Sequence, residues 1–212
     1  MTATALQLIA EDRAVAVVRA PQPFDVGSLA AAMAAGGLRA VELTLTTPGI
    51  LGRLAGSEMG DHAVIGVGTV LTAEDAEAAI DAGAQFLVTP AVREGVAVAA
   101  ARRNIPVIMG AFTPTEVIAA IDLGAAAVKI FPARATGPDY LRDLHGPFPV
   151  LPLIPSGGIN AGNAAEYLEA GAIAVTAGTD VVAPDLVAAE DWTAITDRAK
   201  SFVSAINGQG RQ

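Results

Sequence analysis

One lysine and one glutamate stand inside otherwise apolar runs of this 212-residue chain. Lys129 belongs to the run 127–131, AVKIF, and Glu42 to the run 40–45, AVELTL. Such side chains are almost never fully buried unless they are paired. Burial among apolar groups favours a neutral lysine amine, which can attack a ketone and form a Schiff base, and a nearby glutamate can move the protons. The alternative is a buried ion pair that only fixes the core, although such pairs stabilise little compared with apolar packing.

Two glycine-rich segments in the last third of the chain are suited to binding an anion. The segment 154–163, IPSGGINAGN, precedes a helix that we expect to begin near Asn160, and 174–181, AVTAGTDV, follows the next apolar run. Glycines let backbone N–H groups approach an anion, and a helix N-terminus adds positive potential. The predicted phosphate-binding residues are Ser156, Gly157, Gly158, Gly178 and Thr179. The alternative is that these are ordinary turn glycines.

Short apolar runs are predicted to be the strands that position these residues. They lack polar alternation, which is typical of parallel strands covered on both faces. Segments with helical spacing separate most of them, and four of these segments end in a glycine suited to the left-handed conformation of a helix end. The runs are 14–18, 40–45, 64–68, 85–89, 106–109, 127–131, 152–155 and 173–177, and the glycines are Gly37, Gly83, Gly124 and Gly171.

This alternation predicts an α/β protein with a single-domain (β/α)8 TIM barrel over residues 1–212. An open doubly wound sheet is the alternative, and its glycine-rich phosphate turn should follow the first strand. The segment after the run 14–18 reads RAPQPFD and has no such turn, whereas the glycine-rich turns follow the last two runs. That order favours the barrel, in which the active site lies at the carboxyl ends of the strands.

Strand alternation predicts that Glu42 and Lys129 face each other inside the barrel. Val41 and Leu43 form the apolar face that should meet the helices, so Glu42 points inward, and the same argument applies to Lys129. The second and sixth strands of an eight-stranded ring are opposite one another. We therefore expect the two side chains to converge on the barrel axis.

Four further residues at predicted strand ends are weaker candidates for the site. Arg19 can bind a carboxylate or phosphate, or it is a solvated loop residue. Thr69, in GVGTV, can donate a hydrogen bond to a substrate, or it caps the next helix. Pro90 and Phe131 are expected to shape the wall of the site, with simple packing as the alternative.

Composition excludes several classes of function. Cysteine is absent, which excludes a thiolate metal site and a cysteine nucleophile. The only histidines, His62 and His145, are far apart and precede strands, so we expect them on the solvated amino-terminal face and predict no metal or cofactor. The net charge of −9 disfavours nucleic-acid binding. We predict no membrane span and, because the first residues do not fit a signal peptide, a cytoplasmic location.

These motifs resemble those of the 2-keto-3-deoxy-6-phosphogluconate (KDPG) and 4-hydroxy-2-oxoglutarate (KHG) aldolases over nearly the whole chain. The shared segments are VELTL, GVGTV, QFLVTPAV, VKIFPA, IPSGGIN and AGTDVV. The resemblance implies a class I aldolase that cleaves a phosphorylated sugar acid, with Lys129 as the Schiff-base lysine and Glu42 as the proton-transfer residue. It also implies that Gly157, Gly158 and Thr179 hold the phosphate, that Thr69 lies by the pyruvate-derived carboxylate, and that the protein is a homotrimer.

One position departs from the family pattern. Well-known KDPG aldolases carry an arginine four residues after the catalytic glutamate, where it helps to bind the carboxylate, and this chain has Thr46 there, which we include among the candidate carboxylate-binding residues. The similar 2-keto-3-deoxy-6-phosphogalactonate aldolases also lack that arginine and carry one where Arg19 stands, whereas Ser156 is typical of the gluconate branch. The galactonate series therefore stays open as the alternative substrate.

Two more distant functions also stay open. One is a phosphate-binding barrel that acts as a sugar-phosphate epimerase or isomerase, which needs no imine. The other is a non-catalytic binder of sugar phosphates in which Lys129 is only an ion-pair partner. Neither explains why Lys129 and Glu42 coincide with the whole ordered set of motifs.

Overall fold

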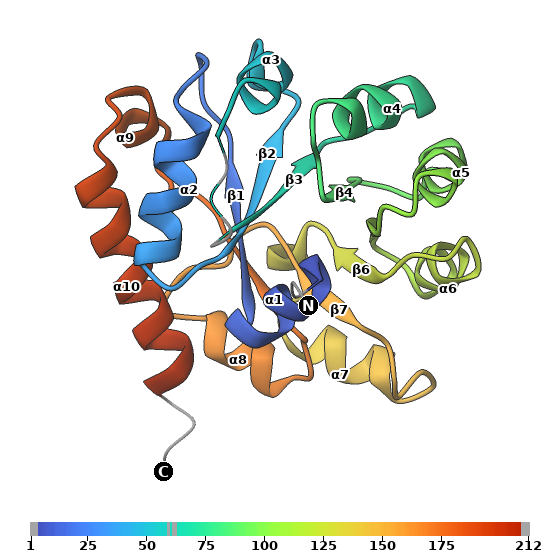
Figure 1. Cartoon of the computed structure of the whole chain (residues 1–212). Coiled ribbons are helices and arrows are strands. Elements are labelled where there is room, and N and C mark those ends of the chain that lie inside the picture. The colour runs from blue at the N-terminus through green and yellow to red at the C-terminus, as the bar shows by residue number, and fades with distance from the viewer. Residues whose placement is uncertain (1–3, 59, 61–62, 209–212) are drawn as a thin grey trace.

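The computed structural model describes residues 4–58, 60 and 63–208, and its strands form a ring of parallel neighbours (Figure 1). The order around the ring is β7-β6-β5-β4-β3-β2-β1-β8. Each predicted apolar run overlaps one strand. The strands are β1 (Ala14–Val18), β2 (Ala40–Thr44), β3 (Val64–Gly68), β4 (Phe86–Val88), β5 (Val107–Ala111), β6 (Ala127–Ile130), β7 (Leu153–Pro155) and β8 (Val175–Ala177).

Helices follow the strands and cover the outside of the ring (Figure 1). They are α1 (Ala5–Asp12), α2 (Val26–Ala35), α3 (Ile50–Ala55), α4 (Ala73–Asp81), α5 (Glu94–Arg102), α6 (Pro114–Asp122), α7 (Asp139–His145), α8 (Ala164–Glu169), α9 (Pro184–Ala188) and α10 (Trp192–Gly208), with a 3-10 turn η1 (Ala133–Ala135) after β6. None of the helices in the described ranges is long and apolar enough to cross a membrane. The four predicted helix-end glycines all have φ between 84° and 103°, which confirms the left-handed helix ends.

The ring closes between β7 and β8, which makes the molecule a (β/α)8 barrel. The amide of Ile173 donates to the carbonyl of Leu153 at 3.0 Å, and the hydroxyl of Thr176 donates to the carbonyl of Pro155 at 3.3 Å. On its other side β8 pairs with β1 in parallel register. The prediction of a TIM barrel is confirmed, and the open doubly wound sheet is wrong.

Helix α1 blocks the amino-terminal end of the barrel. Its Leu8 and Ile9 pack against a layer of inward-facing side chains that includes Val15, Ala40 and Val64, the last two being the first residues of their strands. In Figure 1 this helix lies across the ring of strands. Chemistry inside the barrel is therefore confined to the carboxyl ends of the strands.

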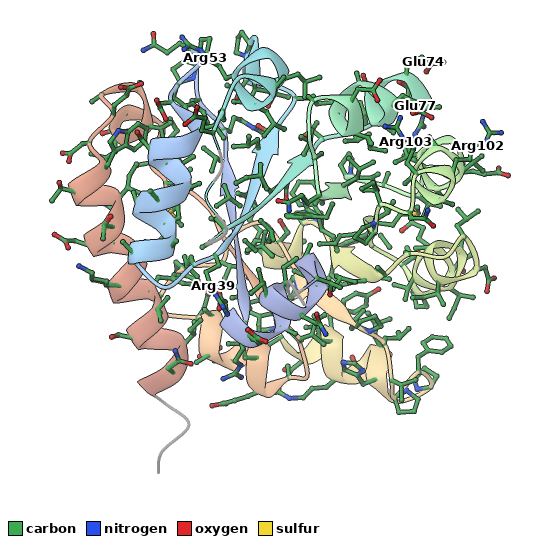
Figure 2. All side chains as sticks on the ribbon, in the orientation of Figure 1. Arg39, Arg53, Glu74, Glu77, Arg102 and Arg103 are labelled. Carbon is green, nitrogen blue, oxygen red and sulfur yellow. The ribbon has the colours of Figure 1, made fainter. Side chains whose placement is uncertain are left out.

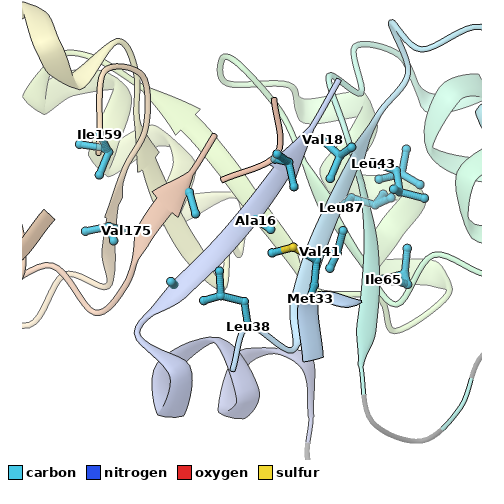
Figure 3. Close-up of a cluster of buried hydrophobic side chains, with 14 of the residues drawn as sticks. Ala16, Val18, Met33, Leu38, Val41, Leu43, Ile65, Leu87, Ile159 and Val175 are labelled. Atoms are coloured by element: carbon cyan, nitrogen blue, oxygen red, sulfur yellow. The ribbon is translucent and has the colours of Figure 1, made fainter. Parts of the chain in front are cut away.

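The larger core lies between the strands and the outer helices (Figure 3). Val41 and Leu43 of β2 contribute to it together with Met33 and Leu38. Because side chains alternate along a strand, the same packing turns Glu42 toward the barrel axis. Burial of the apolar face thus determines the direction of the charged residue.

His145 lies away from the carboxyl ends of the strands. His145 ends α7, and its ring is half-buried against Gly171, where an added Cβ would come within 2.8 Å of the imidazole. The expectation that it is simply solvated is therefore wrong, because the loop before β8 packs over it. His62 lies outside the described residues.

An ion pair between α1 and Arg39, the residue before β2, holds the blocking helix in place (Figure 2 labels Arg39). Asp12, whose side chain is nearly buried, accepts hydrogen bonds from the backbone amide and the guanidinium of Arg39, and the guanidinium bonds to Asp12 and Glu11 raise the pKa of Arg39 above its ordinary value. We expect Arg39→Ala to cost about 1 kcal/mol, since Asp12 then keeps only the hydrogen bond from the backbone amide. Thermal unfolding should show a Tm lowered by about 2–4 °C.

Arg103 provides the matched control for this prediction. It binds Glu77 and Asp81 across α4 and α5 on the exposed surface (Figure 2). Exposed pairs contribute little to stability, and we expect Arg103→Ala to leave Tm unchanged. An Arg39→Ala variant as stable as Arg103→Ala would contradict the proposed anchoring of α1.

Candidate active site

A cavity of about 520 Å³ opens at the carboxyl ends of the strands. Loops that follow strands on different sides of the ring contribute to its lining, as expected for a barrel active site. It brings together all but one of the residues predicted from the sequence. The predicted residues that line it are Arg19, Glu42, Thr69, Pro90, Lys129, Phe131, Ser156, Gly157, Gly158, Gly178 and Thr179.

Lys129 and Glu42 meet at the buried end of this cavity. The Nζ atom of Lys129 lies 3.8 Å from Oε1 of Glu42, and the two residues are only 8% and 1% exposed. That distance is longer than a hydrogen bond, and Oε1 of Glu42 has no hydrogen-bond partner among the described residues. The predicted convergence of the two side chains is confirmed, but they are not locked together as a purely structural ion pair would be.

Gly68 at the end of β3 makes room for the carboxyl group of Glu42. The two residues belong to neighbouring strands, with Glu42 paired with Gly66 and Thr44 with Gly68. A Cβ added at Gly68 would lie 1.8 Å from Oε1 of Glu42 and 2.4 Å from its carboxyl carbon. Only glycine therefore permits this position of the carboxyl group.

Phe131 and Pro90 form walls of the cavity, as predicted. The Nζ atom of Lys129 lies 5.5 Å from the centre of the Phe131 ring, within range of a cation–π contact. Pro90 follows β4 and fits against Gly110 of β5, where an added Cβ would come within 2.3 Å of the Pro90 backbone. Both side chains limit the directions from which a substrate can reach the amine.

The turn after β7 contains two consecutive glycines with positive φ. Gly157 and Gly158 have φ of 90° and 89°, a region that favours glycine. A Cβ at Gly158 would also come within 2.6 Å of the Cβ of Arg134, whose backbone amide donates to the carbonyl of Gly157 at 2.9 Å. The first turn of η1 and the glycine turn therefore form one unit, which brings Arg134 into the cavity lining.

The helix after this turn begins later than predicted. It starts at Ala164 and has six residues, while residues 161–163 form a turn. The side-chain amide of Asn163 donates to the carbonyl of Gly158, and the backbone N–H of Ala161 donates to the carboxylate of Asp180 beyond β8, both at 2.9 Å. The expectation of a helix N-terminus near Asn160 is wrong, and any anion site here depends on the glycine turns.

Comparison with known proteins gives the family. The family model for KDPG and KHG aldolase matches residues 6–198. The 2-dehydro-3-deoxy-phosphogluconate aldolase of Pseudomonas aeruginosa is 34% identical over 190 residues, which cover 89% of this chain and 86% of that protein. The chain belongs to the KDPG and KHG aldolase family. Its members are carbon–carbon lyases, and the chain is therefore an aldolase.

Two solved structures extend this comparison. A KDPG aldolase from Legionella pneumophila, with pyruvate captured at low pH as a covalent carbinolamine intermediate, is 27% identical with a TM-score of 0.82, covering 95% of this chain and 99% of that one. A native KDPGal structure is 28% identical with a TM-score of 0.80, covering 92% of this chain and 94% of that one. This chain therefore shares its barrel fold with both the KDPG aldolase and the KDPGal structure.

Thr69 has a strained backbone at the mouth of the site. Its φ is 63°, which is an outlier for a β-branched residue and costs about 1–3 kcal/mol. The alternative role as a helix cap is wrong, because Thr72 caps α4 by accepting from the amide of Asp75. Thr69 lines the cavity in this strained conformation. The family resemblance predicts that it contacts the pyruvate-derived carboxylate.

Thr46, where well-known KDPG aldolases carry arginine, is the one predicted site residue outside the cavity lining. It lies on the exposed turn after β2, and its hydroxyl is 3.0 Å from that of Thr44, which does line the cavity. The strand ends at Thr44, so the alternation that turns Glu42 inward does not extend to Thr46. Any influence of Thr46 on the site would pass through Thr44.

Sequence reasoning missed three polar residues of the cavity, Thr44, Arg134 and Thr176. Arg134 follows the VKIFPA segment, and its position just beyond β6 was a usable signal. Tyr167 holds this segment by donating to the carbonyl of Ala133 at 3.2 Å, and burial raises the pKa of that phenol, which keeps it protonated. Thr176 gives no signal in the sequence, because threonine is common in strands.

Proposed function

We propose that this aldolase cleaves 2-keto-3-deoxy-6-phosphogluconate to pyruvate and D-glyceraldehyde 3-phosphate through a Schiff base on Lys129. The observation that supports it most is the buried amine of Lys129, 3.8 Å from a carboxyl oxygen of Glu42 at the end of an open cavity. If Lys129 and Glu42 formed only a structural ion pair, the pair would not require an open cavity beside it. It would also not require glycine at position 68, where a Cβ would displace the carboxyl group of Glu42.

The proposed reaction begins when the neutral amine of Lys129 attacks the C2 ketone. Glu42 relays protons as the carbinolamine loses water and becomes the imine. The imine then accepts the electron pair of the C3–C4 bond as Glu42, now a carboxylate, takes the proton of the C4 hydroxyl, and glyceraldehyde 3-phosphate leaves. The enamine is protonated at C3, with Glu42 as the acid through a water, and hydrolysis releases pyruvate. No cofactor takes part.

The cavity also offers the charges that a substrate with two anionic ends requires. Arg19 and Arg134 line it in addition to Lys129, and Glu42 is the one acidic residue of its lining. We assign the phosphate to the two glycine turns, with Ser156, Gly157, Gly158, Gly178 and Thr179 as its ligands. Binding this distant group positions the ketone beside the amine.

Arg134 should matter for the phosphorylated substrate. Its side chain lines the cavity beside the glycine turn, and no ion pair involves it in the part of the chain that the structure describes. We expect Arg134→Ala to raise KM for the phosphorylated sugar acid about tenfold, the loss of one charged hydrogen bond. Steady-state kinetics would measure this against Arg142→Ala, an exposed change on α7, and equal KM values in both variants would contradict it.

Two related substrates remain candidates. The galactonate epimer is favoured by Thr46 in place of arginine and by Arg19 at the end of β1, whereas Ser156 favours the gluconate epimer. KHG is the second substrate in the name of the family, and its cleavage would give pyruvate and glyoxylate. Measuring kcat/KM for the two epimers and for KHG decides among them.

Borohydride trapping with pyruvate tests the mechanism itself. A stable adduct on Lys129, located by intact mass and peptide mapping, would support Schiff-base chemistry. Folded protein without an adduct would remove the class I mechanism, and would favour an epimerase-like or purely binding function.

We also propose an oligomeric state and a cellular location for this protein. The family resemblance implies a homotrimer, and large apolar side chains exposed after β3 and β5, Leu71 and Phe112, provide surface for such contacts. Light scattering should then give three times the chain mass of 21.3 kDa. A cytoplasmic location is proposed because the substrate is a phosphorylated metabolite.

A further inference from the structure

The loops after β1 and β2 are joined by a buried hydrogen bond beside the active-site cavity. The backbone N–H of Ala20 donates to the hydroxyl oxygen of Thr47 at 3.1 Å. The two residues are only 4% and 1% exposed. Because β1 and β2 are paired neighbours in the ring, this bond continues their connection into the loops that leave their carboxyl ends.

The hydroxyl of Thr47 is not used as a helix cap. Thr47 precedes a proline and then a helix, as Thr113 does, and Thr113 caps α6. Helix α3, in contrast, begins after Gly49, and no side-chain cap is present at that end in the described part of the chain. The backbone N–H of Thr47 donates to the carbonyl of Thr44 at 2.9 Å, which closes a turn directly after β2. The buried hydroxyl of Thr47 therefore serves the loop after β1.

The loop that Thr47 holds carries one of the cations of the cavity. Arg19 follows the last residue of β1, comes directly before Ala20 and lines the cavity. Residues 19–25 belong to no helix or strand. Within the described ranges no ion pair involves Arg19. The direction of its side chain therefore depends on how the backbone at Ala20 is held.

We propose that Thr47 is a positioning residue, which holds the loop after β1 so that Arg19 meets an anionic group of the substrate, its carboxylate or its phosphate. The inference rests on the proposed cleavage of a phosphorylated sugar acid. A buried N–H without a partner is costly. Without the hydroxyl of Thr47, the loop moves until water reaches the N–H of Ala20, and Arg19 moves with it. Arginine binds such anions through a planar fork of donors, so a change in its direction weakens the contact.

Steady-state kinetics of Thr47→Val and Thr47→Ser test the proposal. Valine keeps the shape of threonine and removes the acceptor, while serine keeps it. We expect KM for the phosphorylated sugar acid to rise about tenfold in Thr47→Val with kcat within about threefold, and KM to stay within about twofold of wild type in Thr47→Ser. The matched control is Thr196→Val on α10. It also removes a hydrogen bond from a threonine to the backbone, to the carbonyl of Ala32 at 3.0 Å, and should leave KM unchanged.

A double-mutant cycle with Arg19→Ala shows whether Thr47 acts through Arg19. In the expected case, Thr47→Val raises KM about tenfold in the wild type and less than about twofold in the Arg19→Ala background. Equal increases in both backgrounds would overturn the proposal, and so would equal increases in the valine and serine variants. The pyruvate concentration that half-saturates the borohydride adduct identifies the anionic group. Its increase in Thr47→Val assigns Arg19 to the carboxylate, and an unchanged value assigns Arg19 to the phosphate.

The outcomes separate this inference from the proposed function. A wild-type protein that neither forms an adduct nor cleaves the sugar acid would overturn the function, whereas an active wild type with the same KM as Thr47→Val would overturn only the role of Thr47. If Thr47→Val does not fold, a crystal structure of the wild type with 3-phosphoglycerate, which carries both anionic groups, decides. Arg19 within hydrogen-bond distance of either group, with Ala20 bound to Thr47, supports the proposal, and Arg19 directed into solvent contradicts it.

Discussion

Lys129→Ala is expected to abolish turnover while leaving the barrel folded. Without the amine there is no imine, so the C3–C4 bond has no acceptor for its electrons. We expect kcat for cleavage of the phosphorylated sugar acid to fall by at least about 10⁴-fold, equivalent to about 5 kcal/mol of transition-state stabilisation. A coupled assay of pyruvate release would measure it, with circular dichroism to show that the fold persists.

The chain offers an unusually clean control for this experiment, because Lys200 is its only other lysine. Lys200 lies on the exposed face of α10, where it pairs with Asp197 at 3.5 Å. Lys200→Ala should keep full activity and should still form the borohydride adduct, whereas Lys129→Ala should form none. Near-full activity in Lys129→Ala would remove the assignment of the Schiff-base lysine.

The barrel and the reacting pair were predictable because both depend on local periodicity. Continuous apolar runs and glycines after the helices give parallel strands, and the outward burial of Val41 and Leu43 forces Glu42 inward. The same alternation applies to Lys129. Once eight strands close into a ring, the opposition of β2 and β6 is a consequence of their order.

Features that depend on three-dimensional contacts were not predictable in this way. The helix expected near Asn160 begins at Ala164, because side chains bind the preceding backbone groups in a turn. Asn163 accepts from the backbone N–H of Asn160, and Asp180 accepts from that of Ala161. The side-chain amide of Asn163 also donates to the carbonyl of Gly158. Thr46 leaves the cavity because β2 ends at Thr44. Arg134 enters the cavity through its contact with Gly158, which no pattern in either segment indicates alone.

Gly68→Ala is expected to disable the site without touching a reacting group. The new methyl group would lie 1.8 Å from Oε1 of Glu42, and because this oxygen ends a flexible side chain, the carboxyl group moves rather than the strand. A displacement of about 1 Å at a catalytic group can cost about 100-fold in rate. We therefore expect kcat to fall about 100-fold with little change in Tm. Gly52→Ala, on α3 with nothing within 4 Å of the added Cβ, should leave kcat unchanged and should not lower Tm.

A double-mutant cycle with Glu42→Gln shows whether Gly68 acts through Glu42. If glycine matters only because it leaves room for the carboxyl group, Gly68→Ala should reduce kcat strongly in the wild type and hardly at all in the Glu42→Gln background. Equal effects in both backgrounds would mean that the methyl group disturbs the substrate or the strand instead. In the expected case, the reactivity of Lys129 and Glu42, which lie 3.8 Å apart, depends on Gly68 of the neighbouring strand. Because this residue has no Cβ, it leaves the space that the carboxyl group of Glu42 occupies.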